Sequence, residues 1–128
     1  MMIINCDEEL QSAQVMICEF LERYSQINAP EMEVAINEAM NNGYYSSGRV
    51  RFRLKRMGDK LIVRVRDDGQ GFNTKKVNVQ LKTDLFEEKF EQVLEAEGGR
   101  GILLMKLFCD RVIYNDKGNE VLLMKQIH

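Results

Sequence analysis

Three segments of the chain combine residue types that do chemistry with spacings that hold them in place. In the first, Glu38 and Asn42 lie four residues apart, so on a helix they share one face, one turn apart. A carboxylate accepts a proton from a hydroxyl or water, and an amide oxygen ligates a hard divalent ion such as magnesium. Taken alone, such a pair is also typical of a solvated helix face.

The second segment is Asp67-Asp68-Gly69-Gln70-Gly71-Phe72, which ends an apolar strand with an acid and two alternating glycines. A carboxylate at a strand end accepts a hydrogen bond from an exocyclic amine, and glycines let the backbone approach a flat ring closely. The alternative is a turn rich in Asp and Gly, which is common after a strand.

The third segment is Gly98-Gly99-Arg100-Gly101, which precedes an apolar stretch. Backbone amides at the start of a helix bind anions, so this segment predicts a phosphate site. No Gly-Lys-Ser/Thr follows and no strand leads into it, so it is neither a Walker loop nor a Rossmann fingerprint. Glycines before a helix also serve as simple punctuation.

The elements that must position these segments follow from the hydrophobic periodicity. Intervals of three and four predict helices, and alternation predicts strands. The expected helices are 7–24, 30–43 and 102–109, with a short one within 85–94; the expected strands are 2–6, 50–55, 61–66, 111–114 and 121–127. This order favours an α+β fold, a two-layer α/β sandwich with a mainly antiparallel mixed sheet and helices on one face.

Length and composition limit the possible classes of protein. With 128 residues we expect a single domain over 1–128. A formal net charge of −2, with 30% charged and 45% hydrophobic residues, excludes the disordered and collagen-like classes. No basic, apolar leader and no run of roughly eighteen apolar residues is present, so we expect a cytoplasmic protein without a membrane segment. Three widely spaced cysteines and one histidine support neither a disulfide framework nor a Cys/His metal site.

Charge is distributed unevenly along the chain. Residues 1–48 hold eight acids and one base, whereas residues 49–66 hold eight bases and one acid. Alternation places five bases on one face of the predicted hairpin, opposite the core: Arg51, Arg53, Lys55, Arg64 and Arg66. Such a face is either solvated or an interface with an acidic protein surface. Direct binding of nucleic acid is the weaker interpretation, because the chain is not net basic and aromatic interleaving is missing.

Together and in this order, the three segments resemble the N box and the two glycine boxes of the GHKL, or Bergerat-fold, ATPase superfamily. The resemblance covers residues 8–127 and rests on Glu38-Ala39-Met40-Asn41-Asn42, Asp67-Asp68-Gly69-Gln70-Gly71-Phe72 and Gly99-Arg100-Gly101. Within the superfamily, the compact size and the run from Asn37 to Asn42 resemble the anti-sigma factor serine kinases. The combined motifs are specific to the superfamily and less so to the subfamily.

The resemblance implies a sandwich that binds ATP and Mg²⁺ between its helices and its sheet. Glu38 would be the general base that accepts the proton of a substrate serine, and Asn42 would ligate Mg²⁺. Asp67 would bind the adenine amino group, with Gly69 and Gly71 shaping the pocket.

The second glycine box takes its role from the same resemblance. Gly99 and Gly101 would contact the phosphates at the start of a helix, and Arg100 lies between them, directed at a phosphate or at solvent. Residues 73–98 would form the ATP lid.

Two positions depart from the family pattern. Gly43 stands where a small Ala is usual after the magnesium Asn. Asn119 follows Gly118 where the family has a Thr that supports the adenine-binding Asp. Asn119 is expected to substitute through its amide, and nucleotide affinity depends on whether it does.

The resemblance predicts an anti-sigma factor with serine/threonine kinase activity. It would bind a sigma factor, act as a homodimer and phosphorylate a STAS-type anti-anti-sigma protein. Two alternatives stay open: a non-catalytic ATP-binding or nucleotide-free adaptor that uses the basic hairpin as its interface, and an ordinary α+β domain whose glycines are turns. A complete sensor histidine kinase is not expected, because the only histidine is His128 and no dimerisation helix pair precedes the domain.

Overall fold

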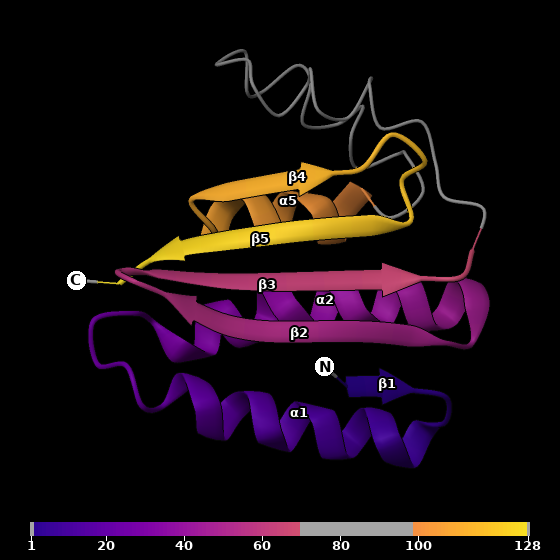
Figure 1. Cartoon of the computed structure of the whole chain (residues 1–128), viewed down its shortest axis with the longest axis horizontal. Coiled ribbons are helices and arrows are strands. Elements are labelled where there is room, and N and C mark those ends of the chain that lie inside the picture. Colours follow the sequence, from indigo (N-terminus) through magenta and orange to yellow (C-terminus); the bar gives the residue numbers. More distant parts are fainter. Residues whose placement is uncertain (1, 70–98, 128) are drawn as a thin grey trace.

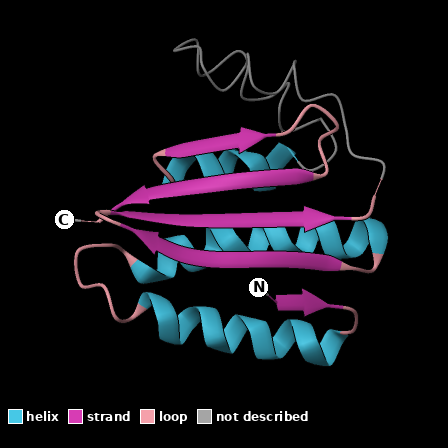
Figure 2. Ribbon diagram, in the orientation of Figure 1, coloured by secondary structure: helices cyan, strands magenta, loops and turns pink. Residues whose placement is uncertain are grey.

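A computed structural model describes residues 2–69 and 99–127. Its elements, in order, are β1 (Met2–Ile4), α1 (Asp7–Leu21), α2 (Ala29–Ser47), β2 (Val50–Met57), β3 (Lys60–Asp67), α5 (Gly99–Phe108), β4 (Arg111–Tyr114) and β5 (Glu120–Gln126). The described helices and strands confirm the predicted α+β class (Figure 2). The expected helix within 85–94 and the expected lid over 73–98 lie outside the described residues.

The five described strands form one sheet in the order β1-β2-β3-β5-β4, and every pairing among them is antiparallel. Figure 1 shows α2 and α5 behind this sheet and α1 beside its β1 edge. In the register, Asp67 at the end of β3 is paired with Val50 at the start of β2. Asp67 therefore lies at the end of the central strand, on the side of the sheet where α2 ends.

The hydrophobic core lies between the helices and the inner face of the sheet. Burial follows the predicted periods, so the helices contribute residues three or four apart and the strands contribute alternate residues. Its fully buried members include Ile4, Ile17, Leu21, Met32, Ile36, Met40, Val50, Leu61, Val63, Met105 and Leu123. Among the described residues, no helix is both long enough and apolar enough to cross a bilayer.

Two helices differ in extent from the prediction. The first ends at Leu21 instead of Tyr24, because the next amides bond back only three residues, from Arg23 to Phe20 and from Tyr24 to Leu21. The second is longer than predicted. It is capped at its start by the side chain of Asn28 and ends at Gly48, whose φ of +75° suits a glycine.

The prediction for the last helix is wrong at its start, which comes at Gly99 instead of Ile102. Gly99, Arg100 and Gly101 are therefore the first turn of α5 and not a loop before it. The first amides of a helix have no partner within the helix. The glycine box thus presents free backbone donors as part of the helix itself.

The outer face of the sheet carries the five bases of the β2–β3 hairpin, as predicted. Arg51 is paired across the two strands with Arg66, and Arg53 with Arg64. Their neighbours Val50, Phe52, Val63 and Val65 are buried on the inner face. No described helix covers the outer face (Figure 1).

Candidate functional site

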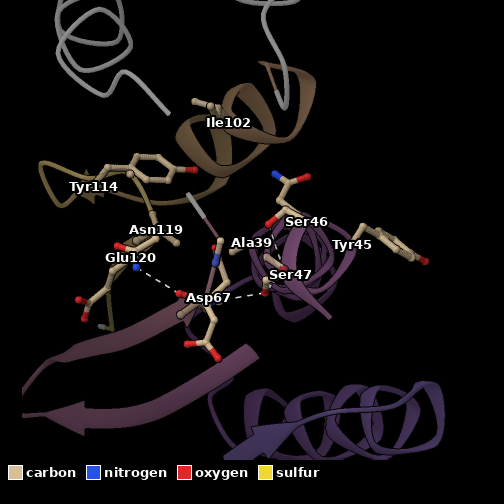
Figure 3. A pocket seen from close by; sticks show the side chains of 16 residues that line it. Ala39, Tyr45, Ser46, Ser47, Asp67, Ile102, Tyr114, Asn119 and Glu120 are labelled. Carbon is tan, nitrogen blue, oxygen red and sulfur yellow. Dashed lines mark hydrogen bonds between the residues drawn. The ribbon is translucent and has the colours of Figure 1, made fainter. Parts of the chain in front are cut away.

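A cavity of about 670 Å³ opens where α2 ends, beside the end of β3 and the start of α5. Its volume is that of a typical small-ligand pocket. Figure 3 shows Ser46 and Ser47 approaching from α2 while Tyr114 and Asn119 approach from the β4–β5 side. Among the residues that line it are Asn42, Gly43, Asp67, Gly69, Gly118 and Asn119.

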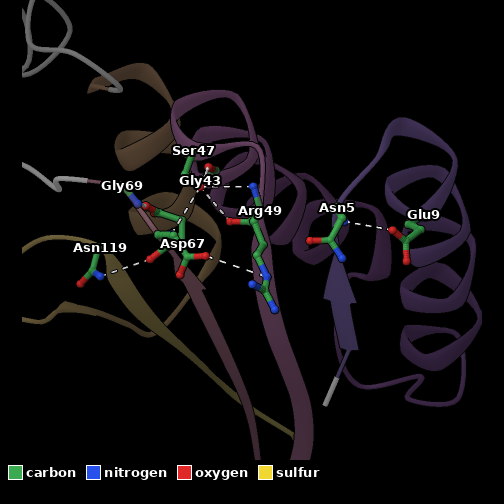
Figure 4. A network of polar contacts seen from close by, with 9 residues as sticks. Asn5, Glu9, Gly43, Ser47, Arg49, Asp67, Gly69 and Asn119 are labelled. Atoms are coloured by element: carbon green, nitrogen blue, oxygen red, sulfur yellow. Dashed lines mark hydrogen bonds and ion pairs between the residues drawn. The ribbon is translucent and has the colours of Figure 1, made fainter.

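Asp67 is held tightly at one end of the cavity (Figure 4). Its Oδ1 accepts a hydrogen bond of 2.7 Å from the N–H of Gly69. A Cβ at Gly69 would lie 2.7 Å from that same oxygen, and a Cβ at Gly43 would lie 3.0 Å from the Cβ of Asp67. A Cβ at Gly43 would crowd the strand beside Asp67, whereas a Cβ at Gly69 would press on the movable end of the Asp67 side chain. The glycine found in place of the usual alanine lets α2 approach β3 this closely.

Asn119 supports Asp67 through the main chain. It is 6% exposed, and its Nδ2 donates to the backbone oxygen of Asp67 at 3.2 Å. Its own backbone oxygen accepts from the N–H of Asp67 at 2.9 Å. Its Oδ1 accepts from Nδ2 of Asn115 at 2.7 Å, which ties it to the β4–β5 turn. The amide thus fixes the end of β3, and it does not contact the carboxylate.

The surroundings shift the pKa of two groups at this end of the cavity. Burial raises the pKa of Asp67 above its ordinary value, and the charge of Asp68 adds to the rise. The hydrogen bond from Gly69 and the charge of Lys117 oppose it. The pKa of the Tyr114 hydroxyl is also raised, mainly by burial and further by the charge of Asp67. A carboxylate in such a half-buried place gains much from a hydrogen-bond donor on a ligand.

Glu38, Asn42 and Gly101 meet at the other end. Glu38 is half-buried and Asn42 is exposed, one turn further along α2. A Cβ at Gly101 would lie 2.8 Å from Oε2 of Glu38 and 3.0 Å from Nδ2 of Asn42. The first turn of α5 therefore passes directly over both side chains, and a side chain at position 101 would displace their ends.

The chemistry of this second end is set by the helix that begins there. The amino terminus of α5 carries partial positive charge and free N–H groups, which together attract anions. The carboxylate of Glu38 and the amide group of Asn42 lie against it, with Nδ2 of Asn42 toward Gly101. Within the described residues no group of three or more His, Cys, Asp or Glu could hold a metal ion.

A family model for the histidine kinase-like ATPase domain matches residues 7–125. The chain belongs to the histidine kinase-like ATPase family. The matched segment contains all three boxes, which confirms the expected superfamily. Membership implies that the domain binds ATP. Comparison with curated proteins gives no match.

The ATPase domain brings the predicted residues to one place from distant parts of the sequence. Asn42, Asp67, Gly69 and Asn119 line the cavity, and Glu38 lies beside it against Gly101. Gly99 and Arg100 belong to the first turn of α5. Gly71 lies outside the described residues.

The cavity residues that the sequence prediction missed include Ser46, Ser47 and Tyr114. Ser46 and Ser47 line it from the last turn of α2, and Ser47 Oγ accepts from the N–H of Asp68 at 3.3 Å. Tyr114 lines it from the end of β4. The two serines could have been noticed as capping residues at the end of a helix. Nothing in the sequence places Tyr114 beside Asp67.

Proposed function

We propose that the chain is a cytoplasmic anti-sigma regulatory factor with ATP-dependent serine/threonine kinase activity. In this proposal it acts as a homodimer, binds a sigma factor and phosphorylates a STAS-type anti-anti-sigma protein. The observation that carries the catalytic part is the carboxylate of Glu38, held against Gly101 at the start of α5. An adaptor that only binds nucleotide needs no carboxylate there.

The residues of the cavity fit ATP and Mg²⁺. The volume of about 670 Å³ admits a nucleotide, and Gly69 and Gly101 leave space that any side chain would fill. Asp67 offers a half-buried acceptor for an exocyclic amine, and the N-terminus of α5 offers donors for phosphates. The amide oxygen of Asn42 is a hard donor of the kind that Mg²⁺ prefers.

Each residue then has one task. When bound, Mg²⁺-ATP supplies the transferable phosphoryl group. Asp67 accepts the hydrogen bond of the base and fixes its register, while the first turn of α5 orients the phosphates. Glu38 accepts the proton of the serine hydroxyl as that oxygen attacks. Such transfer depends mainly on positioning and charge stabilisation, which rigid elements supply.

The test is phosphoryl transfer by the purified chain with γ-labelled ATP, Mg²⁺ and candidate STAS proteins. Transfer is expected to fall by roughly 10²- to 10⁴-fold in Glu38→Ala, the usual contribution of a general base. Glu33→Ala is the matched control, because Glu33 lies on the same helix beside Cys18 and away from the cavity. Equal transfer by the Glu38 variant would contradict the role of Glu38.

A second candidate is a non-catalytic ATP-binding, or nucleotide-free, adaptor of the same fold. Asn119 in place of Thr favours it, because the amide donates to the main chain of Asp67 and not to its carboxylate. Tight ATP binding without transfer to any STAS protein would favour the adaptor. Absence of nucleotide binding would exclude the kinase.

A further inference from the structure

The edge of the sheet at β2 is only partly covered. β1 pairs with β2 from Val50 to Phe52, whereas β2 continues to Met57. The backbone groups of residues 53–57 that point away from β3 therefore have no strand partner among the described residues. Figure 1 shows β1 beside the first part of β2 alone, with α1 on the same side. An unpaired edge of this kind accepts a strand from another chain.

An apolar groove of about 490 Å³ opens beside this edge, between α1 and β2. The residues that line it include the apolar Met16, Phe20 and Leu54 and the charged Glu19, Arg23 and Arg53. Met16 is 47% exposed although it is apolar. The groove lies on the inner side of the edge, where every second side chain of an added strand would point.

The outer side of the same edge is positively charged. Arg53 and Lys55 alternate with Leu54 and are exposed on the outer face. Arg53 is opposite Arg64, a like-charged pair that disfavours the sheet. Arg64 has an acidic partner in Glu120 at 3.3 Å, and no described acid pairs with Arg53 or Lys55. The charges of Arg53 and Lys55 therefore favour an acidic partner strand at this edge.

A second copy of the chain is a poor partner for this edge. Two-fold pairing of residues 53–57 would place Lys55 opposite Lys55 of the other copy. Three of the five edge residues are basic in each copy, namely Arg53, Lys55 and Arg56. Like charges directly opposite each other destabilise a strand pair. Charge complementarity therefore favours an acidic partner.

We propose that the β2 edge binds an extended segment of a partner protein in which acidic and apolar residues alternate. The segment adds a strand of about five residues, roughly 17 Å long, along residues 53–57. Its carboxylates lie across from Arg53 and Lys55 on the outer face, and its apolar side chains enter the groove beside Met16 and Leu54.

The first test uses a fluorescent peptide with a Glu-Val-Glu-Val-Glu centre and measures its anisotropy with the full chain. Peptides with Lys in place of Glu, or with the same residues in blocks, are expected to bind at least about tenfold more weakly. Arg53→Glu is expected to cause a similar loss. Arg111→Glu is the matched control, because Arg111 is exposed on the other edge strand, β4, in the same cross-strand row as Lys55. Its affinity for the peptide is expected to stay within about twofold.

The second test separates strand addition from simple charge attraction. Amide hydrogen exchange within residues 53–57 is expected to slow when the peptide binds. Met16→Ala is expected to weaken binding several-fold, whereas Val15→Ala is not, because Val15 is exposed on the same helix and does not line the groove.

Three results would overturn the proposal. One is equal binding of the alternating and the blocked peptide. Another is unchanged exchange within residues 53–57. The third is a dimer, seen by sedimentation, that Arg53→Glu breaks and the peptide displaces, because a second copy would then occupy the edge. No step needs nucleotide, so failure here leaves the proposed kinase function untouched.

Discussion

The two ends of the cavity at the end of α2 differ in how firmly their polar groups are held. At the Asp67 end, the carboxylate, the strand and the turn are joined by hydrogen bonds among Asp67, Gly69, Asn115 and Asn119. At the Glu38 end, the side chains of Glu38 and Asn42 have no hydrogen bond to another described residue, and the backbone of Gly101 lies against them. One end is fixed by the protein, and the other is open to its ligands.

The difference suits two different tasks. Recognition of a rigid base gains from an acceptor that is already in place, since less freedom is lost on binding. A general base must instead reach a substrate hydroxyl that arrives from another protein, and a catalytic geometry often tightens only in the complex. We therefore expect substitutions at the Asp67 end to change affinity and substitutions at the Glu38 end to change the rate of transfer.

Among variants that leave Glu38 itself unchanged, the largest effect is expected for Gly101→Ala. The new methyl group would press on Oε2 of Glu38 and Nδ2 of Asn42, which are the movable ends of their side chains. The fold should therefore survive while the two groups shift by about an ångström, and a shift of that size costs about 10²-fold in transfer. The rate of phosphoryl transfer at saturating ATP, measured in reactions that are quenched at set times, tests this expectation.

Gly58→Ala is the control for Gly101→Ala. It also adds a methyl group, in open space at a φ of +64°, so strain should lower its stability by about 1 kcal/mol. Its transfer rate should equal that of the wild type. A Gly101→Ala variant that transfers phosphate at the wild-type rate would contradict the assignment of binding to the Asp67 end and transfer to the Glu38 end.

Asp67→Asn should weaken ATP binding by roughly tenfold to a hundredfold, the worth of a hydrogen bond to a charged group. The amide keeps the size of the carboxylate but offers one acceptor fewer and two unwanted donors. Titration calorimetry with ATP and with GTP would measure the loss of affinity. The preference for ATP over GTP should also become smaller. Unchanged affinity for both nucleotides would show that Asp67 does not bind the base.

Asn119→Ala should lower the free energy of unfolding by about 1–3 kcal/mol, because it leaves the backbone oxygen of Asp67 and the amide of Asn115 without their partner in a buried place. Urea denaturation measures the loss. ATP affinity should fall only slightly, since the amide does not touch the carboxylate. A large loss of affinity with unchanged stability would contradict the main-chain role.

The smallest effect is a pH dependence of binding. Because burial raises the pKa of Asp67, its ionised form is lost at a higher pH than for an ordinary aspartate. ATP affinity should therefore decline as the pH falls through that raised value. The ionised form also costs stability above the folded pKa, and this cost is relieved as the pH falls. Asp67→Asn should lack this component, so the difference between the two pH profiles isolates it.

Much of the fold followed from the periodicity of the chain. The alternation of Val50, Phe52 and Leu54 with basic residues placed the strand and its outer face correctly. Spacing also put Glu38 and Asn42 on one side of their helix, away from the core. These features are local, and sequence patterns report local structure well.

The remaining features depend on contacts between distant segments. The start of α5 at Gly99 was missed because glycines signal a loop, and here their backbone packs over Glu38. The route from Asn119 to the main chain of Asp67 spans 52 residues and depends on the register of β3 with β5. Tyr114 reaches the cavity only because β4 lies beside β5.

The most direct test asks whether the Asp67 end binds ATP and the Glu38 end carries out the transfer. Single-turnover phosphoryl transfer to a STAS protein is measured at increasing ATP for the wild type, Asp67→Asn and Glu38→Gln. Saturating ATP should restore the rate of Asp67→Asn to that of the wild type, and it should leave Glu38→Gln slow by roughly 10²- to 10⁴-fold. Restoration of both variants, or a persistent defect in Asp67→Asn alone, would contradict the assignment of binding to one end and transfer to the other.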